Sequence, residues 1–154
     1  MYLKFDLEKK DLSSKEIEEL YETRDPKIHL LLARNRISLH KNIKILKKLA
    51  KSKDFWVRIY IADNPDTPEE VLLDLARDKN YDVVRAITHR AHIPLKVMSV
   101  LALHPDSQIR LALLQRDDVP ESILFILLYD EDRVVRKEAQ RVLEEKKFHL
   151  RVED

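Results

Sequence analysis

The sequence contains no cysteine and no glycine, and each absence excludes a class of chemistry. Without cysteine there are no disulfides, thiolate zinc sites, iron–sulfur clusters or cysteine nucleophiles. Glycine supplies backbone at positive φ and lets the chain approach phosphate closely. Its absence excludes the P-loop, the G-x-G-x-x-G dinucleotide turn, the G-x-S-x-G elbow and the EF-hand turn. We therefore expect no bound cofactor.

Long apolar runs are missing as well. No stretch approaches the roughly 18 apolar residues that a membrane-spanning helix needs. The first ten residues are mixed in charge and lack the apolar segment of a signal peptide. These features predict a cytoplasmic protein without a membrane span.

Neither sign of charge is in excess, because 29 Lys and Arg residues stand against 28 Asp and Glu residues, for a net charge of +1. This balance provides no global field that would attract nucleic acid. Charged residues nevertheless make up 37% of the chain. That proportion is typical of thermophile proteins, and long exposed helices favour it too.

One short pattern recurs along the chain, a branched apolar residue followed by a basic one. It occurs at Val57-Arg58, Val84-Arg85, Ile109-Arg110 and Val135-Arg136, with a degenerate copy at Ile28-His29. The steps between successive copies are similar but not equal, and they fall well within the range of known repeat lengths. A period of roughly 20–50 residues is typical of proteins whose repeats bury their apolar faces by stacking on one another.

Each repeat predicts two short helices. The first begins near a proline (Pro68, Pro94 or Pro120), and Thr67 with Glu70 predicts a capping box there. The second follows an aspartate whose side chain can cap the first turn (Asp25, Asp54, Asp106 or Asp132), although the third repeat has Asn80 and Asp82 on either side of the expected position. Asn35 and Asn64 are expected at left-handed φ, in place of the glycine that commonly ends a helix.

No segment shows the alternation of a strand, so the predicted fold class is all-α. We expect a short right-handed α-solenoid of about five two-helix repeats, forming a single domain over residues 1–154. A leading helix is expected within residues 1–24, the repeats within 25–131, and a capping helix and tail over 132–154. The polar outer face of the last helix would keep the core from ending in water.

The pattern Pro-x-x-x-Leu-x-x-Leu-Ala-x-Asp, followed by Asp-x-x-Val-Arg-x-x-x-Ala-x-Asn, resembles the leucine-rich-repeat variant family and, more broadly, HEAT-type α-solenoids. The resemblance covers residues 25–143 and is best over 54–85. Members of the variant family can carry an iron–sulfur cluster in a cysteine-rich segment, which this chain lacks. Certain alkylpurine DNA glycosylases are also built from HEAT-like repeats. The resemblance implies a recognition scaffold without naming its ligand.

The repeated arginines form a candidate ladder along the stack, made of Arg58, Arg85, Arg110 and Arg136. Such a ladder could follow a phosphate backbone or an acidic peptide. The favoured interpretation is structural, with each arginine bonded to a carboxylate in an adjacent loop, such as Asp54, Asp82, Asp106 or Asp132. Whether the ladder is structural or contacts a ligand is left open.

A basic segment is the second candidate site. Lys41, Lys44, Lys48 and Lys51 are spaced to share one helix face, and Lys47 lies beside them. A basic amphipathic helix can dock on nucleic acid, an anionic membrane or an acidic partner. A solvated outer face is the favoured alternative in a chain so evenly charged.

Exposed positions on the second helices are the third candidate site, and we expect Trp56, Tyr60, Arg90 and Gln115 to contact a protein partner. The histidines (His29, His40, His89, His92 and His104) show no compact pattern of metal ligands, so no metal site is predicted. Residues 123–129 are apolar all round, which predicts either complete burial or a homodimer interface.

Two functions remain open from the sequence. The favoured one is a non-catalytic scaffold that binds a protein partner along its helix surface. The alternative is binding of nucleic acid or another polyanion by the basic segment 41–51 and the arginine ladder, as in a HEAT-like DNA-binding protein. No nucleophile–base pair or oxyanion device can be identified, so no enzyme is predicted.

Overall fold

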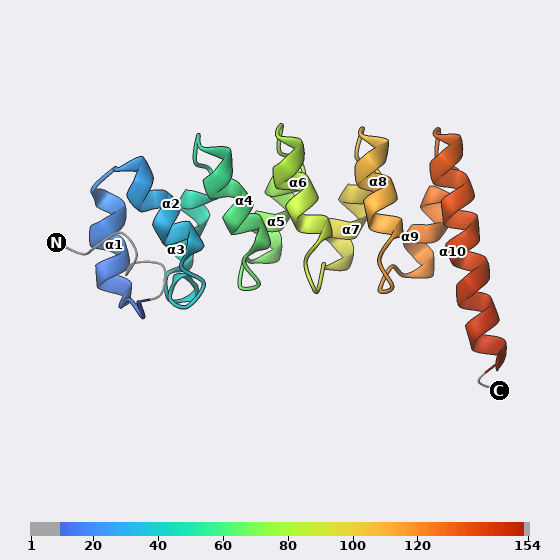
Figure 1. The fold of residues 1–154 in the computed structure, drawn as a ribbon, viewed down its shortest axis with the longest axis horizontal. Helices are drawn as coiled ribbons and strands as arrows, with labels where there is room; N and C mark the ends of the chain where they lie inside the picture. Colours follow the sequence, from blue (N-terminus) through green and yellow to red (C-terminus); the bar gives the residue numbers. More distant parts are fainter. Residues whose placement is uncertain (1–9, 153–154) are drawn as a thin grey trace. The chain divides into compact units, whose positions relative to one another are not determined.

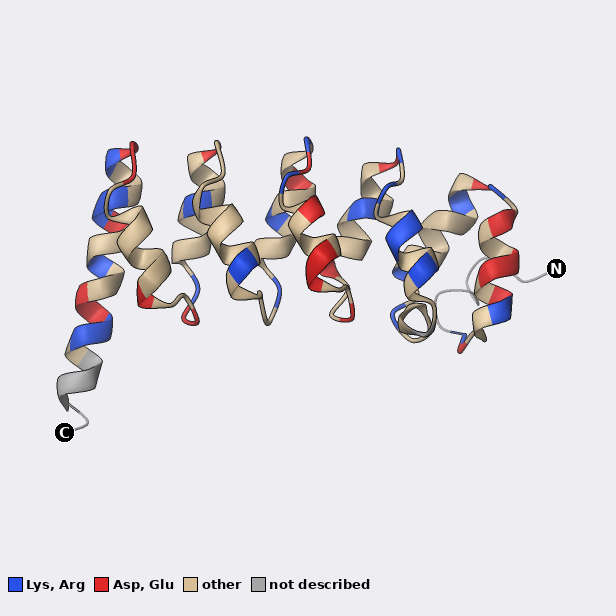
Figure 2. Ribbon diagram, turned by 180° about the vertical axis from the view of Figure 1, so that it is seen from behind, with Lys and Arg blue, Asp and Glu red and all other residues tan. Residues whose placement is uncertain are grey.

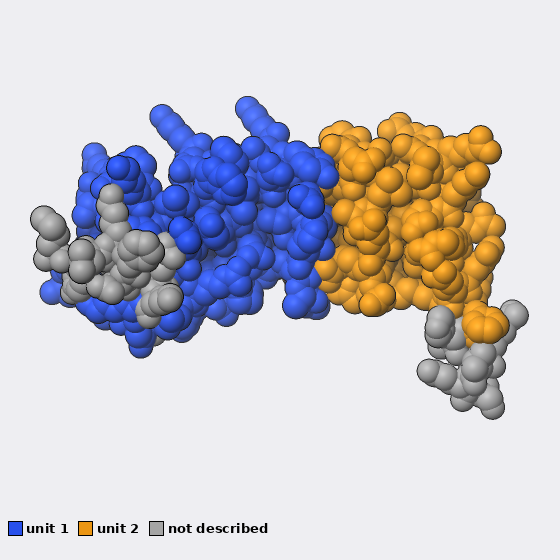
Figure 3. All heavy atoms as spheres, viewed as in Figure 1, with its two compact units in different colours: residues 1–92 blue, residues 93–154 orange. Residues whose placement is uncertain are grey.

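A computed structural model describes residues 10–152, except the side chains of Lys41 and of residues 149–152. Within this range the chain forms ten α-helices and one short 3-10 helix, with no strand among the described residues, which confirms the all-α prediction. The chain divides into two compact units, unit 1 over residues 1–92 and unit 2 over residues 93–154 (Figure 3). The single domain expected from the sequence stays a prediction.

Unit 1 is built from two layers of short helices. Its elements are α1 (Ser14–Glu22), α2 (Pro26–Arg34), the 3-10 helix η1 (Leu39–Lys41), α3 (Ile43–Leu49), α4 (Phe55–Asp63), α5 (Glu69–Leu75) and α6 (Tyr81–Thr88). Helices α2, α4 and α6 pack one against the next, while α3 contacts α2 and α4, and α5 contacts α4 and α6 (Figure 1). Each of these helices therefore packs against its neighbours within unit 1.

Unit 2 has the same kind of helix pair. Its elements are α7 (Leu95–Ala102), α8 (Ser107–Leu114), α9 (Glu121–Leu127) and α10 (Arg133–Val152). Helix α9 packs on α7 and α10, and α8 also packs on α7 and α10. The long α10 continues from the helix that Asp132 caps directly into the polar C-terminal segment.

The second helix of each pair begins at a side-chain cap, as predicted. Asp25, Asp54 and Asp106 each accept the backbone N–H of the residue two positions on at 2.8 Å. Asp132 accepts that of Val134 at 2.7 Å. In the third repeat the cap is Asn80. These acceptors satisfy N–H groups that have no partner within the helix.

The cap positions reveal the register of the repeats. Asp54, Asn80, Asp106 and Asp132 follow one another at equal steps along the sequence. On this register Arg58 corresponds to Val84, and both Val84 and its neighbour Val83 are fully buried. The predicted pairing of Val84-Arg85 with the other Val-Arg copies is therefore wrong by a single position. That slip explains why the Val-Arg copies on either side of Val84 are unequally spaced.

The first helices begin differently from the prediction. Pro68, at the N-cap of α5, makes no side-chain capping bond. The Thr67 hydroxyl instead donates to the carbonyl of Ile61 at 2.6 Å. The predicted capping box is therefore wrong, because Thr67 is buried against the end of α4 and its hydroxyl is used there.

The ends of α2 and α4 do not use left-handed backbone. Among the described residues only Arg24 has positive φ, whereas Asn35 and Asn64 have φ of −78° and −69°. Both asparagines are buried, and their side-chain oxygens accept backbone N–H groups of the following turn. The left-handed prediction is wrong because the side chain, rather than a backbone reversal, caps the turn.

A capping box does occur at the leading helix α1. Ser13 accepts the N–H of Glu16, and the Glu16 carboxylate accepts the N–H of Ser13 at 2.9 Å. The Ser13 N–H, then Lys10 and the Ser13 hydroxyl, lower the pKa of Glu16 to about 2. The carboxylate therefore stays charged, and able to hold the box, well below the usual pKa of a glutamate.

Candidate functional site

Arg58 is held by protein groups on every side of its guanidinium. Nε and Nη2 donate to the two carboxylate oxygens of Asp78 at 2.6 and 3.0 Å. Nη1 donates to the carbonyls of Ser52 and Lys53 at 2.7 and 3.2 Å. The side chain thus ties the loop before α4 to the loop before α6. Hydrogen bonding to Asp78 raises the pKa of Arg58 further.

Arg110 repeats this arrangement in unit 2. Its Nη2 donates to Asp130 at 2.9 Å, and its Nε lies 2.7 Å from the other carboxylate oxygen. Nη1 donates to the carbonyls of His104 and Pro105 at 2.6 and 3.1 Å. The Arg110 and Asp130 side chains are only 4% and 6% exposed. Burial excludes water from the pair, so each charge depends on the other.

The aspartates named from the sequence are not the main partners of these arginines. Asp54 and Asp106 use an oxygen to cap α4 and α8, while the carboxylates that pair with the arginines, Asp78 and Asp130, lie 20 residues after them. Arg136 also bonds inside the fold, through Nη1 to the carbonyls of Asp130 and Glu131. Three of the four ladder arginines therefore bond to the protein's own loops.

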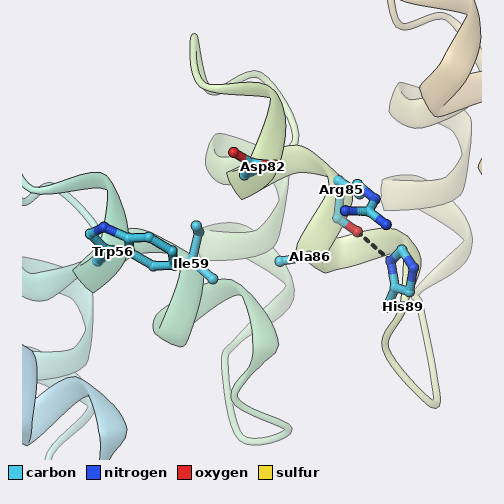
Figure 4. Close-up of a pocket in the computed structure, with 6 residues that line it drawn as sticks. All are labelled: Trp56, Ile59, Asp82, Arg85, Ala86 and His89. Atoms are coloured by element: carbon cyan, nitrogen blue, oxygen red, sulfur yellow. Dashed lines mark hydrogen bonds between the residues drawn. The ribbon is translucent and has the colours of Figure 1, made fainter.

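Arg85 differs from the other three arginines. It is exposed and forms no ion pair within the part of the chain that the structure describes. Instead it lines a hollow of about 420 Å³ between α4 and α6. The lining residues are Trp56, Ile59, Asp82, Arg85, Ala86 and His89 (Figure 4). In the repeat register Arg85 corresponds to Ile59 and Lys137 rather than to Arg58.

The hollow has an apolar side and a basic side. Trp56, 53% exposed, and Ile59 project from α4 on one side, while Arg85 and His89 lie on the other (Figure 4). Nδ1 of His89 donates to the Arg85 carbonyl at 2.9 Å, because a carbonyl can only accept. This bond fixes the imidazole ring beside Arg85. The Asp82 carboxylate lies apart from the Arg85 guanidinium, near the start of α6 (Figure 4).

The other predicted contact residues have different surroundings. Tyr60 is half-buried, with the Arg34 guanidinium 5.4 Å from its ring centroid. Gln115 is exposed at the end of α8. Tyr60 therefore offers only part of its ring to a partner, and Gln115 remains accessible.

Arg90 is not the exposed contact residue that the sequence suggested. It is 9% exposed, and its guanidinium donates to the carbonyls of Ala62 and Asn64, both at 2.6 Å, and of Pro65 at 3.1 Å. Burial lowers the pKa of Arg90, against the opposing effect of nearby aspartates. Arg90 thus caps the end of α4. The burial of Arg90 could have been inferred from the register, because Arg90 takes the position that the buried Asn64 takes in the preceding repeat.

The basic segment does not form one continuous helix face. Lys41, whose side chain lies outside the described part of the structure, ends η1, and Lys51 lies after the last residue of α3, so the predicted shared face is wrong. Lys47 pairs with Glu70 at 2.5 Å, and Lys48 lies 3.9 Å from Glu22. Figure 2 shows the basic residues of α3 in blue. Lys44 and Lys51 are exposed and form no ion pair among the described residues.

The histidines do not gather into a metal site. Within residues 10–148 no three metal-binding side chains come together. His29 stacks on Tyr21 with ring centroids 4.6 Å apart, and its Nε2 bonds to the Tyr21 carbonyl at 2.8 Å. His29 is thus engaged in packing α2 on α1.

Helix α9 exposes one apolar face. Ile123, Leu124 and Leu127 are buried, whereas Phe125 and Ile126 are exposed and Tyr129 is 89% exposed. The complete burial considered from the sequence is therefore wrong, and a homodimer through residues 123–129 stays a prediction. No helix in the described part of the chain is both long enough and apolar enough to cross a bilayer.

Comparison with known proteins gives no relative of this chain: no protein-family model, no curated protein and no solved structure matches it.

Proposed function

We propose that this protein is a non-catalytic repeat scaffold that binds a protein partner on the exposed surface of its second helices. In this proposal the repeats form one right-handed α-solenoid of the HEAT-like or leucine-rich-repeat-variant type. The equal spacing of the caps from Asp54 to Asp132 supports it. So does the recurrence of the same arginine clamp at Arg58 and Arg110.

The observation that carries the proposal is Trp56. More than half of this side chain is exposed, on the rim of a hollow that also contains an exposed arginine. Tryptophan and arginine are enriched among the residues that dominate binding energy at protein interfaces. On the repeat register, the Trp56 position also varies freely, being Lys27, Asp82, Gln108 and Val134 elsewhere. Variable exposed side chains on a constant frame are typical of recognition surfaces in repeat proteins.

Capture from the native host tests this function. We expect the tagged protein to enrich a partner whose affinity falls at least about tenfold on Trp56→Ala, because loss of a central aromatic contact costs about 2 kcal/mol or more. Phe125→Ala is the matched control, since Phe125 is an exposed aromatic residue on α9, outside the second helices. Quantitative mass spectrometry of the three captures gives the measurement. If no protein depends on Trp56 for its recovery, this function is wrong.

Polyanion binding is the second candidate, supported by the exposed Lys44 and Lys51. Affinity for mixed-sequence DNA or RNA would then fall steeply with salt, because phosphate contacts release counterions. Lys44→Glu with Lys51→Glu should abolish binding measured by fluorescence anisotropy at about 50 mM salt. Lys47 and Lys48 contribute less, since Glu70 and Glu22 lie beside them. Binding that the double variant leaves unchanged would exclude this candidate.

A further inference from the structure

We propose that the hollow between α4 and α6 binds an extended peptide segment of the partner in which an acidic residue lies close to an aromatic or branched apolar residue. The carboxylate binds Arg85, and the apolar side chain lies on Trp56 and Ile59. This inference rests on the proposed function and names the chemistry that the partner must supply.

The acidic requirement follows from Arg85. A guanidinium presents five N–H donors in a planar fork that matches a carboxylate. This protein satisfies that fork with its own carboxylates: Arg58 donates two hydrogen bonds to Asp78, and Arg110 donates one to Asp130, whose other oxygen lies 2.7 Å from Nε. Arg85 has no such partner among the described residues, and it faces a hollow. A carboxylate of the partner can form with Arg85 the kind of ion pair that Asp78 forms with Arg58 and Asp130 forms with Arg110.

Asp82 sets the direction of the bound segment. It lies in the first turn of α6, where the positive end of the helix dipole favours a negative charge without a further partner. Its carboxylate would repel an acidic group placed beside it, so the acidic residue binds at the Arg85 and His89 side. One acid and one arginine in the same hollow also fit a single carboxylate better than a continuous row of phosphates.

The apolar requirement follows from the opposite wall. Ala86 is small where the equivalent residue of the preceding repeat is Tyr60, which leaves room beside Trp56. The volume is near the small end of the range for ligand sites, about 300–1,000 Å³, so it suits one or two side chains. Burying such a side chain removes the exposed face of Trp56 from water.

The two walls also set the spacing in the peptide. Packed helices lie about 8–10 Å apart, and an extended chain advances about 3.3 Å per residue. The acidic and apolar residues of the partner should therefore be two or three positions apart.

Selection from a random 12-residue peptide library on phage tests the inference, with wild-type protein, Arg85→Glu and Trp56→Ala as targets. We expect wild-type protein to enrich peptides with Asp or Glu two or three positions from an aromatic or branched residue. Synthetic peptides from that selection should shift the emission of Trp56, the only tryptophan in the chain. Their affinity should fall at least tenfold on Arg85→Glu and several-fold on Arg85→Lys, which keeps the charge but loses the fork.

Lys137→Glu is the matched control, because Lys137 is exposed at the register position equivalent to Arg85 in the last repeat. It should leave peptide affinity unchanged. Thermal melting of each variant by circular dichroism checks that the fold is kept.

The possible results separate this inference from the proposed function. Enriched peptides that depend on Trp56, but lack an acid and bind Arg85→Glu equally well, would overturn the acidic requirement and leave the scaffold function standing. Failure to enrich any peptide that depends on Trp56 would overturn the inference, and the host capture then decides the function separately. Quenching of Trp56 by a mixed-sequence 12-nucleotide DNA or RNA, lost on Arg85→Glu, would replace the peptide with nucleic acid.

Discussion

Replacing Arg110 with alanine is expected to lower the free energy of unfolding by about 3–5 kcal/mol. The substitution would leave the Asp130 carboxylate, 6% exposed, without its arginine partner in a site that excludes water. It would also remove the bonds to the carbonyls of His104 and Pro105. Urea denaturation followed by far-UV circular dichroism measures the loss across all helices.

Arg85→Ala provides the matched control for this prediction. Arg85 is exposed and has no ion pair in the described structure, so its loss should cost less than about 0.5 kcal/mol. Adding Asp130→Ala to Arg110→Ala should cost less than Asp130→Ala costs alone, because the two residues share one interaction. Equal stability of Arg110→Ala and Arg85→Ala would contradict the distinction between a clamp and a free arginine.

Replacing Arg90 with alanine is expected to lower the free energy of unfolding by about 2–4 kcal/mol. The guanidinium bonds three carbonyls at the end of α4, and two of them belong to the buried residues Ala62 and Asn64. Without Arg90 those carbonyls lose a charged donor that water cannot easily replace. Trp56 emission during urea denaturation reports this loss, since Trp56 lies in α4.

Arg77→Ala is the control for Arg90, because exposed Arg77 bonds only one group among the described residues, the carbonyl of Leu73 in its own helix turn. It should change stability by less than about 0.5 kcal/mol. Arg90→Lys should recover part of the loss, since an ammonium keeps the charge but cannot reproduce the planar fork. A partner that dissociates from Arg90→Ala while the protein keeps wild-type stability would instead make Arg90 a contact residue.

Local chemistry made much of the fold predictable. A cap joins a side chain to an N–H two residues away, so the roles of Asp25, Asp54 and Asp106 could be inferred from their positions before helical patterns. The all-α class followed from helical apolar spacing, which is also local. The continuous α10 followed for the same reason.

The candidate site was predictable only in part. Trp56 could be chosen because it is a large aromatic residue at a variable position, and it is exposed. Arg85 was wrongly grouped with Arg58, Arg110 and Arg136, because its Val-Arg motif lies one position away from the register of the other copies. Only the cap at Asn80 showed that Val83 takes the buried position of Val57, that Val84 takes the position of Arg58, and that Arg85 faces outward.

The sequence by itself determined the all-α class and the starts of the helices that Asp25, Asp54 and Asp106 cap. The tertiary structure alone decided the fate of each arginine: Arg58 and Arg110 in clamps with Asp78 and Asp130, Arg90 buried on the carbonyls of α4, and Arg85 exposed in a hollow. The reason is the sequence separation between the groups that interact. A helix and its cap are set by groups a few residues apart, whereas a long guanidinium side chain bonds whichever acceptors the neighbouring repeat brings within reach.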